Sequence, residues 1–126
     1  MPDPTNDIDI DGTTNERNND MKQHLTAVNR TDDNGNPTGG FVVGLGIRIE
    51  WQNGPLGRGA ERIVPNGAFV ESVIEAAAQR IRFYQQSRFA CERNANALFH
   101  LESALAELEA RTAERDTRGV EGTHNA

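Results

Sequence analysis

One stretch, residues 39–74, constrains the fold more than any other part of this sequence. Within it, residues 41–52 alternate between apolar positions and positions that, apart from Val42, are polar or glycine, which is the pattern of a strand with one buried face. Gly44 and Gly46 fall side by side on the other face, where a helix, a second strand or a planar ligand could approach closely. The pattern therefore predicts one continuous strand with a bare patch.

A glycine- and proline-rich turn, WQNGPLGRG, follows at residues 51–59. Its glycine N–H groups could face an anion, but the Gly-Lys-Ser/Thr step of a P-loop and the glycine spacing of a dinucleotide fingerprint are both missing. Asn66 is the candidate N-cap of a following helix, and Glu71 places a carboxylate in its first turn. Local chemistry thus predicts a turn and a helix start, without a defined nucleotide motif.

The residues before this stretch give two further predictions. Residues 1–21 are rich in Asp, Asn and Thr and have no apolar periodicity, so we expect a disordered acidic tail. Residues 22–30 alternate well enough for a strand, and a concentrated turn signal follows at residues 31–40. Residues 22–64 are therefore predicted to form a β-hairpin region with a long polar tip and a glycine-rich loop.

Residues 65–126 predict a helical hairpin and a C-terminal binding tail. Spacings of four and three give each of two helices, over about residues 66–86 and 90–115, an apolar stripe. The stripes are Val70, Ile74, Ala77, Ile81 and Tyr84, and Leu98, Leu101, Leu105, Leu108 and Thr112. A short link makes such helices antiparallel neighbours. The expected fold is α+β, with an antiparallel β-hairpin or small sheet before the two helices, as one domain over residues 22–126 that forms homo-oligomers.

Charge and cysteine content exclude several classes of protein. Residues 1–20 hold six acidic residues and one basic residue, a net charge of −5, so the remaining residues carry only −1 of the total −6. This near-neutral part argues against DNA binding. The lone Cys91 excludes an internal disulfide and is predicted to be a small core filler, and the three scattered histidines match no metal site. No secretory signal and no apolar run of transmembrane length is present, which predicts a soluble protein without membrane association.

Arginines mark the end of the second helix. Arg111, Arg115 and Arg118 recur at spacings of four and three, so their guanidinium groups fall along one face. Such a face is either solvated and favoured by the helix dipole, or available for phosphate contacts. Gly119 fits the left-handed cap that ends a helix. No set of residues is placed for nucleophilic or acid–base catalysis, so no catalytic residue is predicted.

Three segments together resemble one known family: WQNGPLGRG followed by NGAFVESVI, then RNANALFHLESAL, and the ending RTAERDTRGVEGTH. They look like the Thoeris anti-defence proteins of the first type, small phage proteins whose helical hairpin is shared with the phage anti-CBASS sponge. The resemblance covers about residues 22–124. It implies a homo-oligomer, a hexamer in the family, that sequesters nucleotide immune signals in the host cytoplasm without degrading them, so that the downstream effector stays inactive.

The resemblance also implies a ligand and its binding residues. The Thoeris signal is a cyclic form of ADP-ribose, such as glycocyclic ADP-ribose, and some relatives hold the cyclic di- and trinucleotides of CBASS in a second pocket. The residues carried over for cyclic ADP-ribose are Trp51, Tyr84, Phe89, Asn94, Arg111 and Arg115, and those for the second nucleotide site are Arg118, Gly122 and Thr123. Rings would stack on adenine, the amide would meet base or ribose edges, and arginines would hold phosphates. Trp51 is alternatively a core residue, because it ends the apolar face of its strand.

Other classes of function stay open, and none of these readings requires a cofactor or a metal. A structural phage assembly protein could be built on the helical hairpin with no nucleotide ligand. A nucleic-acid-binding protein should show a strongly basic surface and a steep salt dependence of binding. An enzyme acting on the same signals would return an altered ligand.

Overall fold

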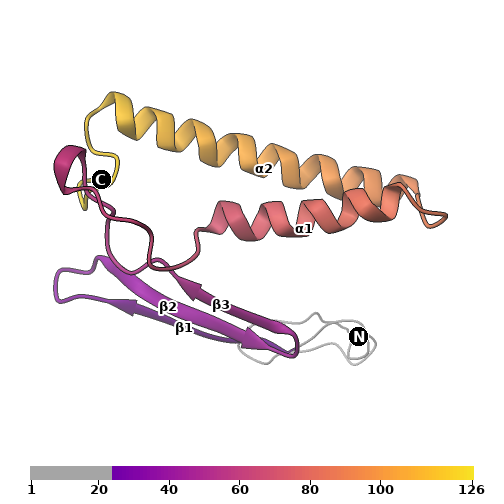
Figure 1. Cartoon of the computed structure of the whole chain (residues 1–126), viewed down its shortest axis with the longest axis horizontal. Helices are drawn as coiled ribbons and strands as arrows, with labels where there is room; N and C mark the ends of the chain where they lie inside the picture. Colours follow the sequence, from indigo (N-terminus) through magenta and orange to yellow (C-terminus); the bar gives the residue numbers. More distant parts are fainter. Residues whose placement is uncertain (1–23) are drawn as a thin grey trace, which may run out of the picture. The chain divides into compact units, whose positions relative to one another are not determined.

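The computed structural model describes residues 24–126, so the predicted acidic tail at residues 1–21 lies outside the described residues. Two compact units make up this part of the chain. The first unit ends at Gly54 and also takes in Pro65–Gly67, and the second holds Pro55–Val64 and Ala68–Ala126. The first contains a small sheet and the second a pair of helices (Figure 1), which confirms the predicted α+β class.

The first unit is a three-stranded antiparallel sheet in the order β1, β2, β3. Its strands are β1 (Thr26–Thr31), β2 (Pro37–Gly44) and β3 (Ile47–Trp51). The Asp32 side chain organises the turn between β1 and β2, because its Oδ1 accepts hydrogen bonds from the N–H groups of Asn34 and Asn36 at 2.8 and 2.9 Å. The predicted hairpin with a polar tip is confirmed, with a tip shorter than expected because β2 already begins at Pro37.

The prediction of one strand over residues 41–52 is wrong, because the chain reverses direction at Leu45 and Gly46. Gly46 has a φ of +75°, a left-handed conformation that glycine adopts readily. The tight turn pairs Gly44 with Ile47, so the side chains of β3 fall on the opposite face from the one that unbroken alternation assigns. The predicted patch of two neighbouring glycines does not form, since Gly46 lies in the turn.

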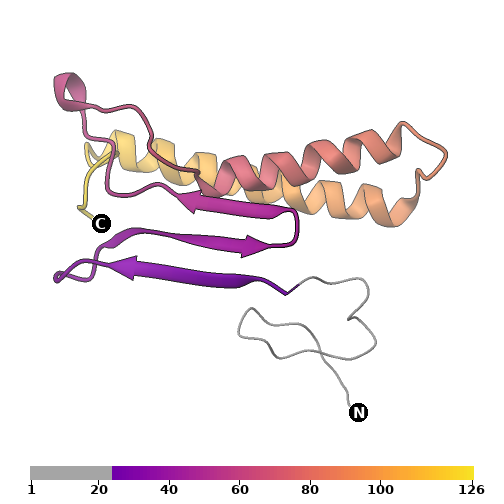
Figure 2. The same cartoon turned by 60° about the horizontal axis from the view of Figure 1, so that its bottom comes forward.

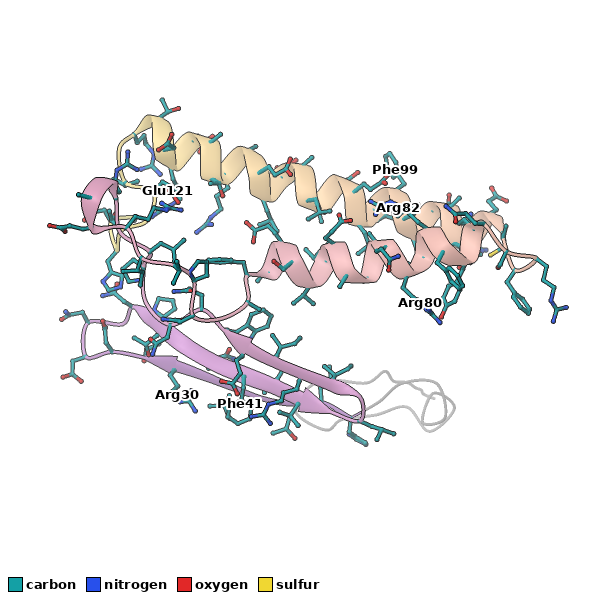
Figure 3. The ribbon with its side chains drawn as sticks, viewed as in Figure 1. Arg30, Phe41, Arg80, Arg82, Phe99 and Glu121 are labelled. Carbon is teal, nitrogen blue, oxygen red and sulfur yellow. The ribbon has the colours of Figure 1, made fainter. Side chains whose placement is uncertain are left out.

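Gly40 allows β1 and β2 to approach closely. It is buried, and a Cβ at this position would collide with the carbonyl oxygen of Val28 in β1. On the same face its cross-strand partner in β3 is Trp51, which is half-buried. The next residue, Phe41, lies on the other face, where the guanidinium of Arg30 stacks 5.6 Å from its ring centroid (Figure 3). Both faces of the sheet thus depend on the register of these strands.

The second unit is an antiparallel helical hairpin, as predicted, formed by α1 (Val70–Gln85) and α2 (Glu92–Thr117) and drawn side by side in Figures 1 and 2. Arg82 bridges the helices, since its Nη1 lies 2.9 Å from Glu75 on α1 and its Nη2 lies 3.3 Å from Glu102 on α2. Neither helix in the described part of the chain is long and apolar enough to cross a membrane.

The apolar stripes are confirmed only in part. In α2 the four leucines of the predicted stripe are half-buried, although Thr112 is exposed. In α1 the one fully buried residue is Ala78, whereas the predicted Ala77 is exposed and Val70 is 50% exposed. Neighbouring alanines have the same size and polarity, so heptad spacing alone could not decide which of them faces α2.

The start of α1 also differs from the prediction, because Asn66 does not cap it. The Asn66 side chain accepts a hydrogen bond from the Asn53 N–H at 2.8 Å and donates one to the Asn53 carbonyl oxygen at 3.1 Å. Its own N–H donates to Oε1 of Gln52 at 2.8 Å. The helix instead begins after Phe69, which supplies no side-chain cap. Pairing both backbone groups of Asn53 just beyond β3 has taken the Asn66 amide away from the helix.

Candidate functional site

The end of the hairpin at the α1–α2 link carries exposed aromatic and arginine side chains, which we call the tip cluster: Arg80, Phe83, Tyr84, Arg88 and Phe89. The Arg80 guanidinium lies 4.9 Å from the Phe83 ring centroid and 5.0 Å from that of Tyr84, and its Nε donates to the Tyr84 hydroxyl at 3.2 Å (Figure 3). The Arg88 guanidinium lies 4.5 Å from the Phe89 ring centroid. Phe83 is 51% exposed and Phe89 62%. Exposed rings with attached cations suit a ligand that is both aromatic and anionic.

Side-chain hydrogen bonds hold the link in shape. The Gln85 amide accepts from the Cys91 N–H at 3.0 Å and donates to the Cys91 carbonyl oxygen at 3.1 Å. The Nδ2 of Asn94 donates to the Phe89 carbonyl oxygen at 3.5 Å, and its Oδ1 accepts no hydrogen bond from residues 24–126. Three of the predicted ligand residues, Tyr84, Phe89 and Asn94, therefore belong to one short region with an open amide oxygen.

Cys91 is not the core filler that the sequence suggested. It is exposed and forms the N-cap of α2, where its Sγ accepts a hydrogen bond from the Asn94 N–H at 3.4 Å. The first N–H groups of an α-helix have no acceptor within the helix. In α2 the Cys91 thiol accepts a hydrogen bond from one of these groups, the N–H of Asn94. Because sulfur is a weak hydrogen-bond acceptor, a side chain with an oxygen acceptor should cap α2 better than the Cys91 thiol does.

Replacing Cys91 with serine is expected to raise the free energy of unfolding by about 0.5 kcal/mol, because a hydroxyl is a stronger N-cap than a thiol. Urea unfolding followed by circular dichroism measures the change. Cys91→Ala is the matched comparison, since it removes the acceptor and leaves a residue of similar size. A serine variant no more stable than the alanine variant would rule out a capping role for Cys91.

The opposite end of the hairpin is closed by the C-terminal residues. Gly119 has a φ of +78°, and its N–H donates to the Asp116 carbonyl oxygen at 3.0 Å. The N–H of Val120 donates to the Arg115 carbonyl oxygen at 3.0 Å, which completes a Schellman motif and confirms the predicted cap. The chain then leaves the end of α2 as a short tail that runs toward the loop around Gly57 (Figures 1 and 2).

This tail docks on the glycine-rich loop. The N–H of Gly57 donates to the Gly122 carbonyl oxygen at 2.8 Å, so that donor is not free for an anion. Arg115 fixes the tail from α2, because its Nη2 donates to the carbonyl oxygens of Val120 at 3.0 Å and Thr123 at 3.2 Å. Arg118 reaches the chain end, where its Nη1 donates to the Ala126 carbonyl oxygen at 2.9 Å. Three residues predicted for the second nucleotide site thus lie in or beside one docked tail.

Three arginines surround Glu121 of the tail, and we call Arg58, Arg62 and Arg115 the arginine cluster. The first two flank the short 3₁₀ helix η2 (Gly59–Glu61). Nη1 of Arg62 lies 2.7 Å from Oε1 of Glu121, and Nη1 of Arg58 lies 3.9 Å from the same oxygen. The hydrogen bond from Arg62, together with the charges of Arg58 and Arg115, lowers the pKa of Glu121. The carboxylate labelled in Figure 3 is therefore an ionised group held between guanidinium groups.

Open grooves along the hairpin carry several acidic residues in their linings. One groove is lined by Arg62, Glu71, Glu109, Thr112, Ala113, Asp116 and Glu121, and the adjoining one by Glu71, Ser72, Glu75, Ala76, Gln79, Leu105 and Glu109. The first groove has four carboxylates beside Arg62. The lining of the second groove holds three carboxylates and no cation, although Arg82 pairs with Glu75 at its edge, and this disfavours phosphate in the second groove. Residues 24–126 contain no group of three or more His, Cys, Asp or Glu side chains able to hold a metal. An anionic ligand is therefore expected at the ends of the hairpin.

The predicted residues for cyclic ADP-ribose are not all close together within one chain. Asn94 lies in the first turn of α2, and Arg111 follows 17 residues later on the same helix. At a rise of 1.5 Å per residue these positions are about 26 Å apart along the helix axis, which is beyond the reach of one small nucleotide. Arg111 is exposed and makes no hydrogen bond or ion pair with residues 24–126. Trp51 belongs to the sheet of the first unit.

Several residues that the structure groups together were not predicted as site residues from the sequence: Arg80, Phe83 and Arg88 at the tip, and Arg58, Arg62 and Glu121 at the tail. Arg80 precedes Phe83 and Tyr84 by three and four positions, a spacing that makes them neighbours on a helix and could have identified the stack. Arg62 and Glu121 are separated by 59 positions, and no local pattern links them.

Two comparisons with known proteins give matches. The family model of the Acb2/Tad1 hairpin domain matches residues 45–113, more than half of the chain. A relative in the Bacillus phage SBSphiJ7, "Thoeris anti-defense 1", is 49% identical over 59 residues. That alignment covers 47% of this chain and 42% of the relative, so it spans less than half of either protein.

Proposed function

Because the chain belongs to the Acb2/Tad1 hairpin family, we propose that it is a phage anti-defence protein that binds a cyclic ADP-ribose signal and sequesters it without degradation. The name of its phage relative points to the Thoeris system as the target. The signal proposed from the family resemblance is a cyclic ADP-ribose such as glycocyclic ADP-ribose. The observation that carries the proposal is the tip cluster, which lies within the matched residues and leaves rings and guanidinium groups open to solvent.

The chemistry of a cyclic ADP-ribose fits these groups. Its adenine is a flat aromatic system that can stack on Tyr84 or Phe89, and the open Oδ1 of Asn94 can accept a hydrogen bond from the exocyclic amine. Its pyrophosphate needs guanidinium donors, and Arg111 has its full set of donors available within the described residues. Stacking, amide and phosphate contacts together can surround a ligand of this kind.

We propose that the complete site forms between copies of the chain, because Asn94 and Arg111 are too far apart on one α2 to share a small ligand. Exposed apolar side chains support association: Phe99 is 64% exposed on the outer side of α2 (Figure 3), and Val70 is 50% exposed on α1. In a closed ring of copies, a hexamer by family resemblance, the tip cluster of each copy would lie beside Arg111 of a neighbouring copy. Neither end then has to supply the whole site.

Sequestration requires affinity and abundance, and it requires no chemical step. A sponge in the host cytoplasm lowers the free signal when it binds more tightly than the effector and is present in excess. Arg118, Gly122 and Thr123 are proposed to serve cyclic di- or trinucleotides at a second site. In this proposal the protein acts as a binder with no catalytic residue.

Retention of unaltered ligand tests the proposed function. Purified protein is mixed with cyclic ADP-ribose isomers and cyclic di- and trinucleotides, free ligand is removed by filtration, and heat-released ligand is identified by mass spectrometry. Recovery of an intact cyclic ADP-ribose supports a sponge, whereas an altered product indicates an enzyme. Failure to retain any of these ligands would reject the sponge and favour a structural assembly protein.

Mixing two inactive variants tests whether two copies build one site. Tyr84→Ala and Arg111→Ala are each expected to lose ligand retention alone. When the two chains are denatured, mixed in equal amounts and refolded, about a quarter of the sites should recover, because one chain supplies the intact ring and its neighbour the intact arginine. Retention per protomer is measured by filtration.

Mixing Tyr84→Ala with the double variant Tyr84→Ala/Arg111→Ala is the control, since no pairing of those chains restores an intact ring. No recovery in the first mixture, with both variants folded and oligomeric, would reject a site that takes its ring from one copy and its arginine from another.

A further inference from the structure

We propose that the arginine cluster, Arg58, Arg62 and Arg115, is a phosphate-binding site that the Glu121 carboxylate occupies in the free protein. The ligand class is a pyrophosphate or phosphodiester anion. The site itself is argued from contacts within the second unit, and its use for the phosphates of a cyclic nucleotide rests on the proposed function.

Unused donors in the cluster support this site. Within residues 24–126, Arg58 and Arg62 each form their hydrogen bonds through Nη1 alone, and Arg115 through Nη2 alone. A guanidinium has five N–H donors arranged as a planar fork, and phosphate oxygens take two parallel hydrogen bonds from such a fork. Each arginine therefore keeps donors that a phosphate could use.

Glu121 is an exchangeable occupant. Its carboxylate makes a 2.7 Å contact with Arg62, yet its side chain is 22% exposed and that of Arg62 is 42% exposed, so solvent reaches the pair. A pyrophosphate carries more negative charge and more acceptor oxygens than one carboxylate, and can engage two guanidinium groups together. Exchange of the carboxylate for a phosphate therefore keeps the contact between a guanidinium and an anionic oxygen, and it increases the number of hydrogen bonds that the arginines can make.

Displacement of the Glu121 side chain need not detach the tail. Other hydrogen bonds hold the backbone of the tail: the Gly57 N–H donates to the Gly122 carbonyl oxygen, and Nη2 of Arg115 donates to the carbonyl oxygens of Val120 and Thr123. Asp116 lies 3.2 Å from Nη1 of Arg58 and stays as a partial counter-charge. Glu121 thus competes with an added anion for the arginine cluster, while the backbone of the tail stays in place.

Titration of the full-length protein with inorganic pyrophosphate tests the proposal. The ¹⁵N-labelled wild type, Glu121→Gln and Glu75→Gln are compared at constant ionic strength, with the amide resonances of Gly57 and Gly122 as reporters. Glu75→Gln is the matched control, because that carboxylate lies 2.9 Å from Arg82 in another ion pair. Glu121→Gln is expected to bind pyrophosphate about tenfold more tightly than the wild type, since it removes both a competitor and a like charge. Glu75→Gln should match the wild type.

Arg62→Gln, alone and combined with Glu121→Gln, completes the test. It should weaken pyrophosphate binding in both backgrounds. Equal affinities for Glu121→Gln and Glu75→Gln, or binding that is insensitive to Arg62→Gln, would overturn the proposal. A second titration with cyclic ADP-ribose identifies the source of the anion: the same amide shifts indicate a nucleotide pyrophosphate, and shifts with inorganic pyrophosphate alone indicate a free phosphate ion. Filter retention of cyclic ADP-ribose without any pyrophosphate effect would leave the proposed function standing and remove only this site.

Discussion

Arg111→Ala is expected to lower the affinity for cyclic ADP-ribose by about a hundredfold while changing the free energy of unfolding by less than about 0.5 kcal/mol. Loss of one partner of a desolvated charged pair costs a complex about 2 to 5 kcal/mol, which accounts for the drop in affinity. Arg111 is exposed and has no hydrogen-bond or ion-pair partner within residues 24–126, which accounts for the unchanged stability. Calorimetric titration gives the affinity, and urea unfolding gives the stability.

Arg115→Ala should behave differently from Arg111→Ala although the two residues lie four positions apart on α2. It removes the donors to Val120 and Thr123, so we expect both weaker ligand binding and a loss of about 1 to 3 kcal/mol in stability. Arg48→Ala is the control, because that side chain is 75% exposed in β3 and only weakly paired with Glu50. Wild-type affinity in Arg111→Ala would exclude Arg111 from the site and weaken the case for a site between copies.

Gly40→Ala is expected to destabilise the sheet by about 3 kcal/mol, the largest stability effect of any single methyl group that we anticipate. Two costs combine at this position. Its φ of +141° is one that residues with a Cβ rarely adopt, and the new Cβ would collide with the Val28 carbonyl oxygen of the adjacent strand. The pairing of β1 with β2 must then open or shift. Hydrogen exchange of the β1 and β2 amides, with urea unfolding, measures the loss.

Gly35→Ala separates these two costs. Gly35 also has a positive φ, +81°, but an added Cβ would meet no atom within 4 Å. Only the backbone cost applies there, about 1 to 2 kcal/mol. Equal destabilisation by the two alanine variants would show that close contact between the strands contributes nothing at Gly40.

The family was more accessible from the sequence than the arrangement of the candidate site was. Segments such as WQNGPLGRG and RTAERDTRGVEGTH indicated the family because they are specific strings, and the family match agrees with them. The roles of single residues did not follow in the same way. Arg111 and Arg115 share a spacing and a helix face, yet Arg111 has no side-chain partner among residues 24–126 whereas Arg115 anchors the tail. The difference depends on where the chain goes after Gly119, which helical spacing does not encode.

The sequence by itself determined the features that depend on neighbouring residues. The polar turn after β1, the antiparallel helices and the Gly119 cap follow from turn chemistry, apolar spacing and the conformational freedom of glycine, all of which act over a few positions. Only the tertiary structure decided the reversal at Leu45 and Gly46, the use of Asn66 to bind Asn53, and the pairing of Arg62 with Glu121. In each of these cases the local sequence allowed several conformations or hydrogen-bond partners. Contacts with residues elsewhere in the chain selected one of them.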